Sequence, residues 1–101
     1  MTISRTDLKS AAIQAVRFEP DFLIVDLQDG RTIYIPLAWY PRLFHATQPE
    51  REHFRLIGYG EGIHWPDLDE DISLEHLILG IPSGESQTSL QKWLEKRQKT
   101  G

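Results

Sequence analysis

The sequence predicts a small α+β domain with a three-stranded antiparallel meander, short helices, a second β-hairpin and a C-terminal helix. Three observations predict this fold class. Runs rich in β-branched and aromatic residues, which suit a pleated sheet, occupy much of residues 13–36. Capping-box patterns, which start helices, occur at 47–50 and 88–91. The 101 residues are 40% hydrophobic and 26% charged, which suits one globular domain with a single modest core.

The meander follows an N-terminal arm of residues 1–12 and opens the α+β domain, which we place at residues 13–80. Its predicted strands are residues 13–18, 22–28 and 32–35. Asp29-Gly30 predicts a tight hairpin turn between the last two strands, because such turns need positive φ at their central residues. Pro36 ends the return strand because it has no N–H to donate to a neighbour.

A short helix is predicted next, over residues 37–46, where Pro41 suits a first helical turn. Helical spacing places Trp39, Leu43 and Ala46 on the side that faces the sheet. The capping box at 47–50 then predicts a further helical turn that continues to about His53.

The second hairpin is predicted from two short apolar runs, residues 54–57 and 63–65, on either side of a glycine-rich turn. A brief helix follows over residues 73–79. The acidic run 69–71 precedes this helix and carries the charge that a helix N-terminus favours, so we expect it to cap the free N–H groups. Gly80 is well placed to end the helix.

The tail, residues 81–101, begins with a polar segment that contains Pro82 and Gly84 and is predicted to be a linker. The capping box at 88–91 predicts an amphipathic helix over residues 89–99. Its apolar edge consists of Leu90, Trp93 and Leu94. Three arrangements stay open: the helix packs on its own domain, docks on a second subunit, or becomes ordered with a partner.

Charge and composition exclude several classes of function. The net charge is −4. Residues 1–80 carry 7 basic and 13 acidic side chains, whereas residues 81–101 carry 4 basic and 2 acidic side chains. This balance argues against a nucleic-acid partner for this chain alone, because phosphate binding needs clustered Lys and Arg. No membrane-spanning run or signal peptide is recognisable, so we expect a cytoplasmic protein. The absence of cysteine excludes thiolate metal sites and cysteine nucleophiles.

The densest group of chemically active side chains lies between His64 and Asp71. Asp67, Asp69 and Asp71 alternate as in a calcium loop, but Ile72 stands where that loop needs glycine. His64 with one or two of these aspartates is a candidate magnesium or zinc site. Helix capping is the favoured interpretation of the segment. No cofactor is predicted, and no nucleophile elbow or phosphate-binding loop is present, so an enzyme is not favoured.

Aromatic residues support two interpretations. Trp39 and Tyr40, together with Tyr59 and Trp65, suit a small core because each ring buries a large area. They also suit an interface, since Trp and Tyr are enriched among binding hot spots. Trp39 and Tyr40 are therefore candidate partner-binding residues alongside the apolar edge of the tail helix.

Three longer motifs resemble the bacterial domain-of-unknown-function family 2442. They are Val-Asp-Leu-Gln-Asp-Gly-Arg at 25–31, Pro-Leu-Ala-Trp-Tyr-Pro-Arg-Leu at 36–43 and Gly-Ile-His-Trp-Pro-Asp-Leu-Asp-Glu-Asp-Ile-Ser at 62–73, with Ala-Thr at 46–47. The resemblance implies a β-meander followed by helices and a second hairpin. It implies no catalytic residue. Similar proteins can carry a helix-turn-helix after this domain, or are encoded beside a second small protein as in toxin–antitoxin pairs. Residues 81–101 allow only one helix, so this chain departs from the first pattern.

These observations lead to three hypotheses about function. The leading one is a non-enzymatic protein-binding module, the antitoxin-like partner of a neighbouring gene product. The second is a small metal-binding protein or metal-assisted hydrolase that uses the segment from His64 to Asp71. The third is a homo-oligomeric structural domain in which Trp93 packs against a second copy.

Overall fold

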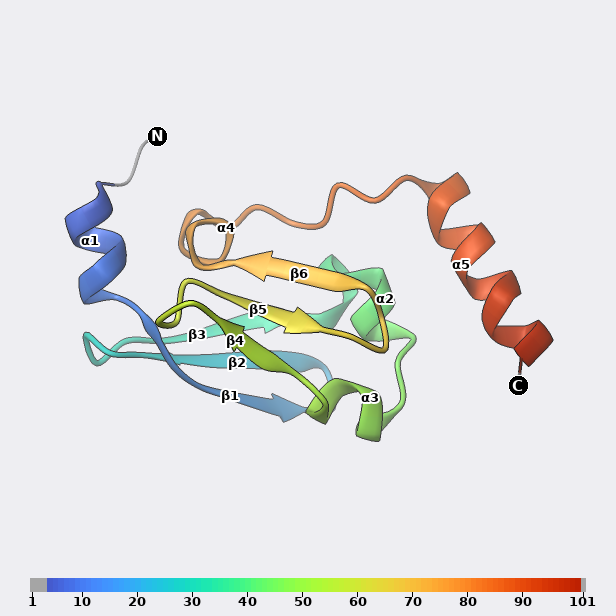
Figure 1. Ribbon diagram of the computed structural model, residues 1–101, viewed down its shortest axis with the longest axis horizontal. Coiled ribbons are helices and arrows are strands. Elements are labelled where there is room, and N and C mark those ends of the chain that lie inside the picture. Colours follow the sequence, from blue (N-terminus) through green and yellow to red (C-terminus); the bar gives the residue numbers. More distant parts are fainter. Residues whose placement is uncertain (1–3, 101) are drawn as a thin grey trace.

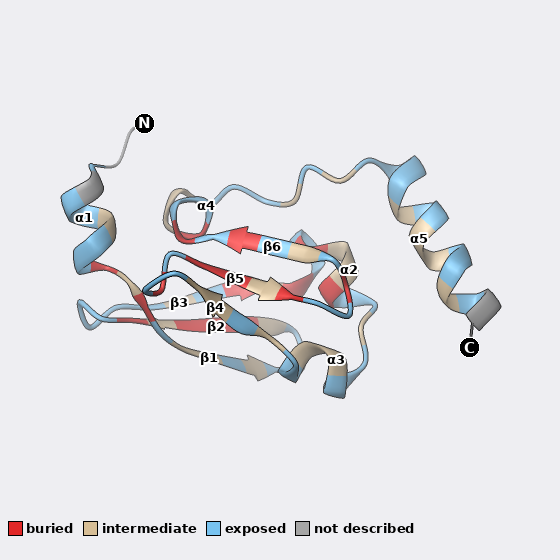
Figure 2. Ribbon diagram, in the orientation of Figure 1, coloured by how far each residue is buried: buried red, intermediate tan, exposed pale blue. Residues whose placement is uncertain are grey.

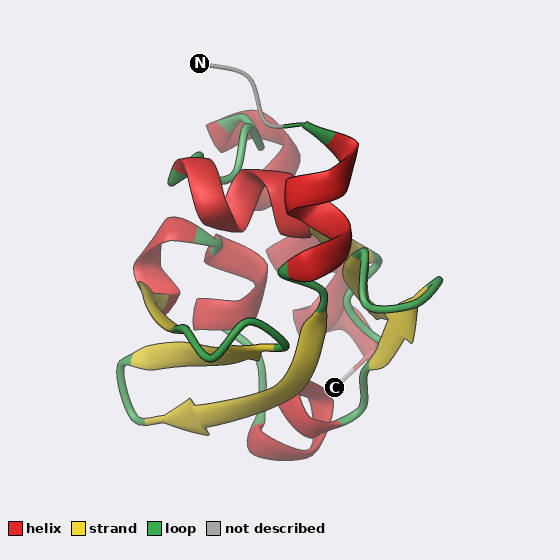
Figure 3. Cartoon of the chain, turned by 90° about the vertical axis from the view of Figure 1, so that its left-hand side faces the viewer, coloured by secondary structure: helices red, strands yellow, loops and turns green. Residues whose placement is uncertain are grey.

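The computed structural model of the protein describes residues 4–100. It contains two three-stranded antiparallel sheets, of order β1–β2–β3 and β4–β5–β6, with helices at both ends of the long axis (Figure 1). Figure 3 shows the helices in red and the strands in yellow from the end where α1 lies. In chain order the elements are α1 (Arg5–Ser10), β1 (Ile13–Glu19), β2 (Phe22–Leu27), β3 (Thr32–Pro36), the 3₁₀ helix η1 (Leu37–Trp39), α2 (Pro41–Phe44), α3 (Gln48–Glu52), β4 (Arg55–Ile57), β5 (Gly62–Trp65), β6 (Glu70–Ser73), α4 (Leu74–Leu79) and α5 (Gln87–Thr100). The predicted α+β class is confirmed.

The meander matches the prediction closely. The register sets Val16 opposite Val25 and Val25 opposite Ile33, so alternate apolar side chains line one face of the sheet. The turn between β2 and β3 uses Gly30 at φ 96°, the positive value that the Asp-Gly pair predicts. Pro36 is the last residue of β3, as expected.

Both sheets contribute to one hydrophobic core, which is drawn in red in Figure 2. Trp65 at the end of β5 is fully buried, and its indole N–H donates to the carbonyl oxygen of Arg51 at 2.9 Å. A buried indole needs such a partner, because an unsatisfied polar group costs free energy in an apolar environment. The other fully buried side chains of large volume are Leu23, Ile24, Leu27, Leu37, Leu43, Ile63, Leu68, Ile72 and Val25.

The helix predicted over residues 37–46 is two short elements, η1 and α2. Tyr40 separates them with φ −127° and ψ 86°, which no helix accommodates. Pro41 begins α2, as predicted, and Leu43 is fully buried. The prediction that Trp39 faces the sheet is wrong: its side chain is 38% exposed, because the break at Tyr40 removes it from the helical face of Leu43.

The capping box before α3 is confirmed. The Thr47 hydroxyl accepts from the backbone N–H of Glu50 at 3.3 Å, and the Glu50 carboxylate accepts from the N–H of Thr47 at 2.8 Å. Glu50 is thereby held at the start of α3, where it also faces α5, as described below.

The acidic run 69–71 does not cap a helix, so that prediction is wrong. Glu70–Ser73 is strand β6, which extends the predicted second hairpin to a three-stranded sheet by pairing with β5. Ser73 is the residue that caps α4, and its hydroxyl accepts from the N–H of His76 at 3.1 Å. Gly80 ends α4 in the left-handed conformation, at φ 72°, as predicted.

The two ends of the described chain are helical. The predicted N-terminal arm contains α1, which Ser4 caps. Helix α5 begins at Gln87, and Ser86 accepts from the N–H of Ser89 at 3.1 Å. The predicted capping box at Thr88 is therefore wrong, because Thr88 already lies inside the helix. No helix among residues 4–100 is long and apolar enough to cross a membrane.

Candidate protein-binding surface

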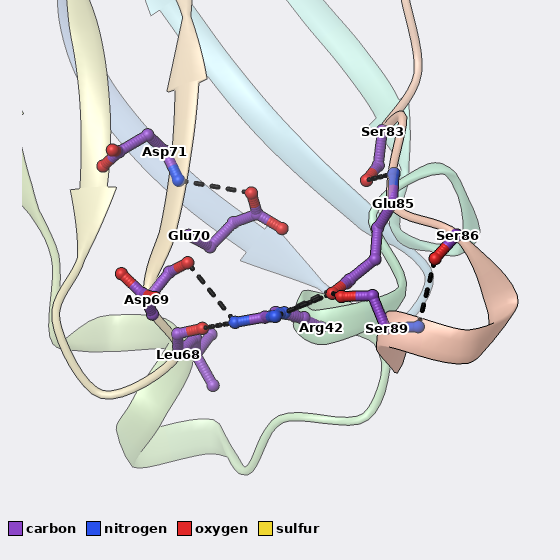
Figure 4. Close-up of polar contacts among 9 residues, drawn as sticks. All are labelled: Arg42, Leu68, Asp69, Glu70, Asp71, Ser83, Glu85, Ser86 and Ser89. Carbon is purple, nitrogen blue, oxygen red and sulfur yellow. Dashed lines mark hydrogen bonds and ion pairs between the residues drawn. The ribbon is translucent and has the colours of Figure 1, made fainter. Parts of the chain in front are cut away.

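Arg42 on α2 joins its helix to the turn before β6 and to the segment before α5 (Figure 4). Its Nη1 donates to the carbonyl oxygen of Leu68 at 2.8 Å, in the turn that leads into β6. Its Nε and Nη2 donate to the Glu85 carboxylate at 3.0 and 2.7 Å. These two side chains are only 16% and 11% exposed. The hydrogen bonds from Arg42 lower the pKa of Glu85, and those to Glu85 raise the pKa of Arg42.

The Arg42–Glu85 pair holds the start of α5. The Ser89 hydroxyl, in the first turn of the helix, donates to the same Glu85 carboxylate at 2.8 Å. A charged pair with this little solvent around it is screened far less than a surface salt bridge. The first turn of α5 is therefore fixed to α2 by contacts that neither element could form alone.

The middle and the second half of α5 are held by Trp93 and Arg97. The Trp93 ring lies under two guanidinium groups, with Arg42 at 5.2 Å and Arg97 at 4.6 Å from its centroid, and Trp93 also packs against the core. Arg97 donates from Nη1 and Nη2 to the two Glu50 oxygens, both at 2.8 Å. These bonds, with those from Thr47, lower the pKa of Glu50 from 4.5 to about 2.

The segment between α4 and α5 has no helix or strand, in agreement with the predicted linker, but it is attached to η1 at two points. The N–H of Ser83 donates to the carbonyl oxygen of Trp39 at 3.0 Å, and the Tyr40 hydroxyl donates to that of Ile81 at 2.8 Å. Tyr40 is only 4% exposed and belongs to the core, and burial raises the pKa of its hydroxyl. Of the two interpretations of the aromatic residues, Tyr40 fits the core and is not accessible as a partner-binding residue.

Several apolar side chains on α5 and in the segments before it are only partly covered. Trp93 packs against the core, whereas Leu90 and Leu94 are half-buried and are not among the described side chains that pack against it. Trp39 and Ile81, on the two segments joined through Ser83, are 38% and 40% exposed. We define the α5 surface as Leu90 and Leu94 of α5.

Comparison with known proteins gives the family. The family described as protein of unknown function DUF2442 matches residues 13–83. The chain belongs to the DUF2442 family. A crystal structure of a protein of unknown function from Rhodospirillum rubrum is 28% identical to this DUF2442 protein, with a TM-score of 0.64, and the match covers 79% of this chain and 96% of that one. No curated protein matches the sequence.

A second solved structure shares the fold of the DUF2442 protein. It is the solution structure of an uncharacterized protein from Chromobacterium violaceum, 17% identical, with a TM-score of 0.64 and a match that covers 83% of this chain and 77% of that one. Glu85 and α5 lie beyond the residues that the family description matches. The contacts that hold α5 therefore combine family positions, such as Arg42 and Glu50, with positions outside the match.

The four candidate metal ligands of the DUF2442 protein are not brought together at one point. His64 on β5 bonds through Nδ1 to Asp71, its cross-strand partner on β6. Asp67 instead bonds to Nδ1 of His53, at 2.7 Å. Asp69 has a positive φ of 50°, and its carbonyl oxygen accepts from Arg42 at 3.4 Å. Within residues 4–100, no group of three or more His, Asp or Glu side chains could hold a metal ion.

Sequence reasoning did not find the ionic contacts that position α5. Arg42 and Glu85 are 43 positions apart, and Glu50 and Arg97 are 47 apart, so no local pattern connects them. Glu70 was also assigned to capping, yet it is half-buried beside Arg42, and burial raises its pKa. Glu50, Glu85 and Arg97 all lie in polar segments, so the sequence carried no local signal for these contacts.

Proposed function

We propose that this DUF2442 protein is a non-enzymatic protein-binding module. Its partner is the product of a neighbouring gene, as in toxin–antitoxin pairs, and α5 is its binding element. The observation that carries the proposal is the α5 surface, where Leu90 and Leu94 stay half-buried while the adjacent Trp93 packs against the core. Two leucines four residues apart are the pattern that a helix uses to enter an apolar groove.

The contacts that order the helix support this role. A helix that is already ordered loses little conformational entropy when it binds, so more of the contact free energy becomes affinity. Arg42, Glu85, Glu50 and Arg97 supply that order through their ion pairs. Trp39, exposed next to the preceding segment, adds an aromatic side chain of the kind enriched at binding hot spots.

Charge favours a basic partner. Residues 1–80 carry 13 acidic and 7 basic side chains, a net charge of −6. Complementary charge steers the encounter of two proteins and raises the association rate. The partner that fits best therefore combines an apolar groove for α5 with a basic surface around it.

The test is co-expression with the neighbouring gene product, followed by size-exclusion chromatography at micromolar concentration. The wild-type chain is expected to co-elute with its partner. A Leu90→Glu, Leu94→Glu double variant is expected to elute separately, because two charges would enter the apolar groove. The matched control is Thr88→Glu, Gln91→Glu, which adds the same charge at exposed positions of α5 and should still co-elute. Separate elution of the two wild-type proteins, or co-elution of the leucine variant, would contradict the proposal.

A further inference from the structure

Glu70 is a half-buried carboxylate without a cation of its own. It lies on β6 opposite the fully buried Trp65, so its side chain is on the face of the sheet that packs toward the core. Its Oε1 accepts from the N–H of Asp71 at 3.2 Å, and no side chain among residues 4–100 donates to it. A partly buried charge without a counter-charge destabilises the state that contains it.

The nearest cation, Arg42, is already paired with another carboxylate. Figure 4 shows Glu70 on β6 and Glu85 on the segment before α5, both beside the Arg42 guanidinium. Glu85 accepts from Nε and Nη2 of Arg42 at 3.0 and 2.7 Å. Burial raises the pKa of Glu70, and the charge of Glu85 adds to this rise. Two carboxylates that repel each other therefore lie next to one guanidinium.

Glu85 belongs to a part of the chain that can separate from the body without breaking a strand. Residues 81–86 form no helix or strand, and most of the α5 helix that follows is exposed (Figure 2). The contacts that hold this part include the ion pairs of Glu85 and Arg97 and the packing of Trp93. A segment held at its margin by a few side chains opens at a lower free-energy cost than the strands of a core.

We infer that Glu70 is a second partner for Arg42, and that it replaces Glu85 when residues 81–100 detach from the body of the protein. In the attached state, which Figure 4 shows, Glu85 binds Arg42 and Glu70 has no cation. In the detached state Glu70 turns to Arg42, which its bond to the Leu68 carbonyl oxygen still holds beside β6. The guanidinium is neutralised in both states, which makes detachment less costly.

The exchange of partners is coupled to a proton. Glu70 binds a proton more readily in the attached state, where it is half-buried and faces Glu85, than in the detached state, where it is paired with Arg42. The state that binds more protons is favoured as the pH falls. Attachment of α5 should therefore become tighter as the pH is lowered from 7 toward 5.

The other groups that face Glu70 do not reverse this sign. They are Arg42 from α2, Glu85 from the segment before α5, Asp71 on its own strand and the Tyr40 hydroxyl. The pKa values of Arg42 and Tyr40 are raised, so both keep their protons between pH 5 and 7. The pKa of Glu85 is lowered, so it stays charged over the same range.

The inference goes beyond the proposed function, because it concerns how α5 is attached and not what α5 binds. Its test needs only the purified full chain. Failure of the exchange between Glu70 and Glu85 would leave the partner-binding proposal as it stands, and absence of a partner would leave the exchange as it stands.

Amide hydrogen exchange in α5 measures the population of the detached state. A helix of 14 residues is marginal in water on its own, so its amides exchange once it detaches. Glu70→Gln removes the competing charge but keeps an oxygen for the N–H of Asp71. It should slow exchange in α5 about three- to tenfold at pH 7, since one pKa unit corresponds to a factor of ten. It should also reduce the change in α5 protection between pH 5 and pH 7, after correction for intrinsic exchange.

The matched control is Glu75→Gln, which removes an exposed carboxylate on α4 and should leave exchange in α5 unchanged. Circular dichroism verifies that each variant is folded. Equal exchange of α5 in the wild type and Glu70→Gln, or an α5 without measurable protection in the wild type, would overturn the inference.

The Glu85→Gln background separates a change of partner from simple repulsion. Repulsion between the two carboxylates ends when Glu85 is neutral, so Glu70→Gln would then have no effect on α5. A second partner for Arg42 predicts that Glu70→Gln still slows exchange in α5 about threefold or more in this background. The Nε–H NMR signal of Arg42 should persist in Glu85→Gln and be lost in the double variant. No effect of Glu70→Gln in this background, or loss of the Arg42 signal in Glu85→Gln alone, would contradict the exchange.

Discussion

Glu50→Gln tests the ion pair that holds the second half of α5. The variant removes the charge that faces Arg97 but keeps a side-chain oxygen for the N–H of Thr47, since glutamine also completes a capping box. The Glu50 pKa falls from 4.5 to about 2 on folding, and each pKa unit corresponds to about 1.4 kcal/mol. The contribution of this ion pair to the free energy of unfolding is thus at most about 3 kcal/mol. Because the Glu50 side chain is 21% exposed, we expect Glu50→Gln to lower the free energy of unfolding by about 1–2 kcal/mol.

The pH dependence is the sharper part of this prediction. A carboxylate whose pKa falls on folding stabilises the protein above its unfolded pKa, and this contribution is lost as the pH falls through 4.5 toward 2. The difference in unfolding free energy between wild type and Glu50→Gln should be about 1–2 kcal/mol at pH 6 and less than half of that at pH 3.

Urea denaturation at the two pH values measures this difference. With a typical slope of about 1–3 kcal/mol per M, the midpoints at pH 6 should differ by about 1 M. The other carboxylates titrate in both proteins, so their contributions cancel in the comparison. Equal midpoints at pH 6, or a difference that does not change with pH, would refute the reasoning.

Three further perturbations follow from the fold. Gly60→Ala should destabilise the chain by about 2–4 kcal/mol, because Gly60 has a φ of 88° and the new Cβ would clash with the Ile13 backbone. A thermal midpoint equal to that of the wild type would contradict this. Thr47→Ala should lower the free energy of unfolding by about 1 kcal/mol, because the cap of α3 is lost. Chemical denaturation would detect this loss, and the conservative Thr47→Ser should restore the stability. Zinc or magnesium should shift the melting temperature by less than about 1 °C, since His64 and its neighbouring carboxylates form separate pairs. A clear rise in melting temperature would favour a metal site in the segment from His64 to Asp71.

The parts of the fold that were predictable are those that depend on residues close together in sequence. The Asp29-Gly30 turn, the capping box from Thr47 to Glu50 and the end of α4 at Gly80 each need only a few neighbouring side chains. The alternating apolar residues of β1–β3 predicted their pairing for the same reason, because consecutive strands joined by tight turns have a fixed register.

The errors arose where a distant partner determines the local structure. Residues 69–71 are acidic and precede a helix, so local propensity favours a cap, but pairing with β5 makes Glu70 and Asp71 part of a strand. The Tyr40 hydroxyl has its partner at Ile81, which is 41 positions away. Of the candidate α5 residues, Leu90 and Leu94 are half-buried, and their role in binding stays a prediction. The two arginines around Trp93 could not be predicted from spacing.

The attachment of residues 81–85 to η1 and α2 changes which fragment should be regarded as the folding unit. A chain cut at residue 83, where the family match ends, would lose the carboxylate that neutralises Arg42. A guanidinium with this little access to water is costly to leave without a counter-charge. We therefore expect versions of this protein that end before Glu85 to melt earlier than the full chain, even though every strand remains.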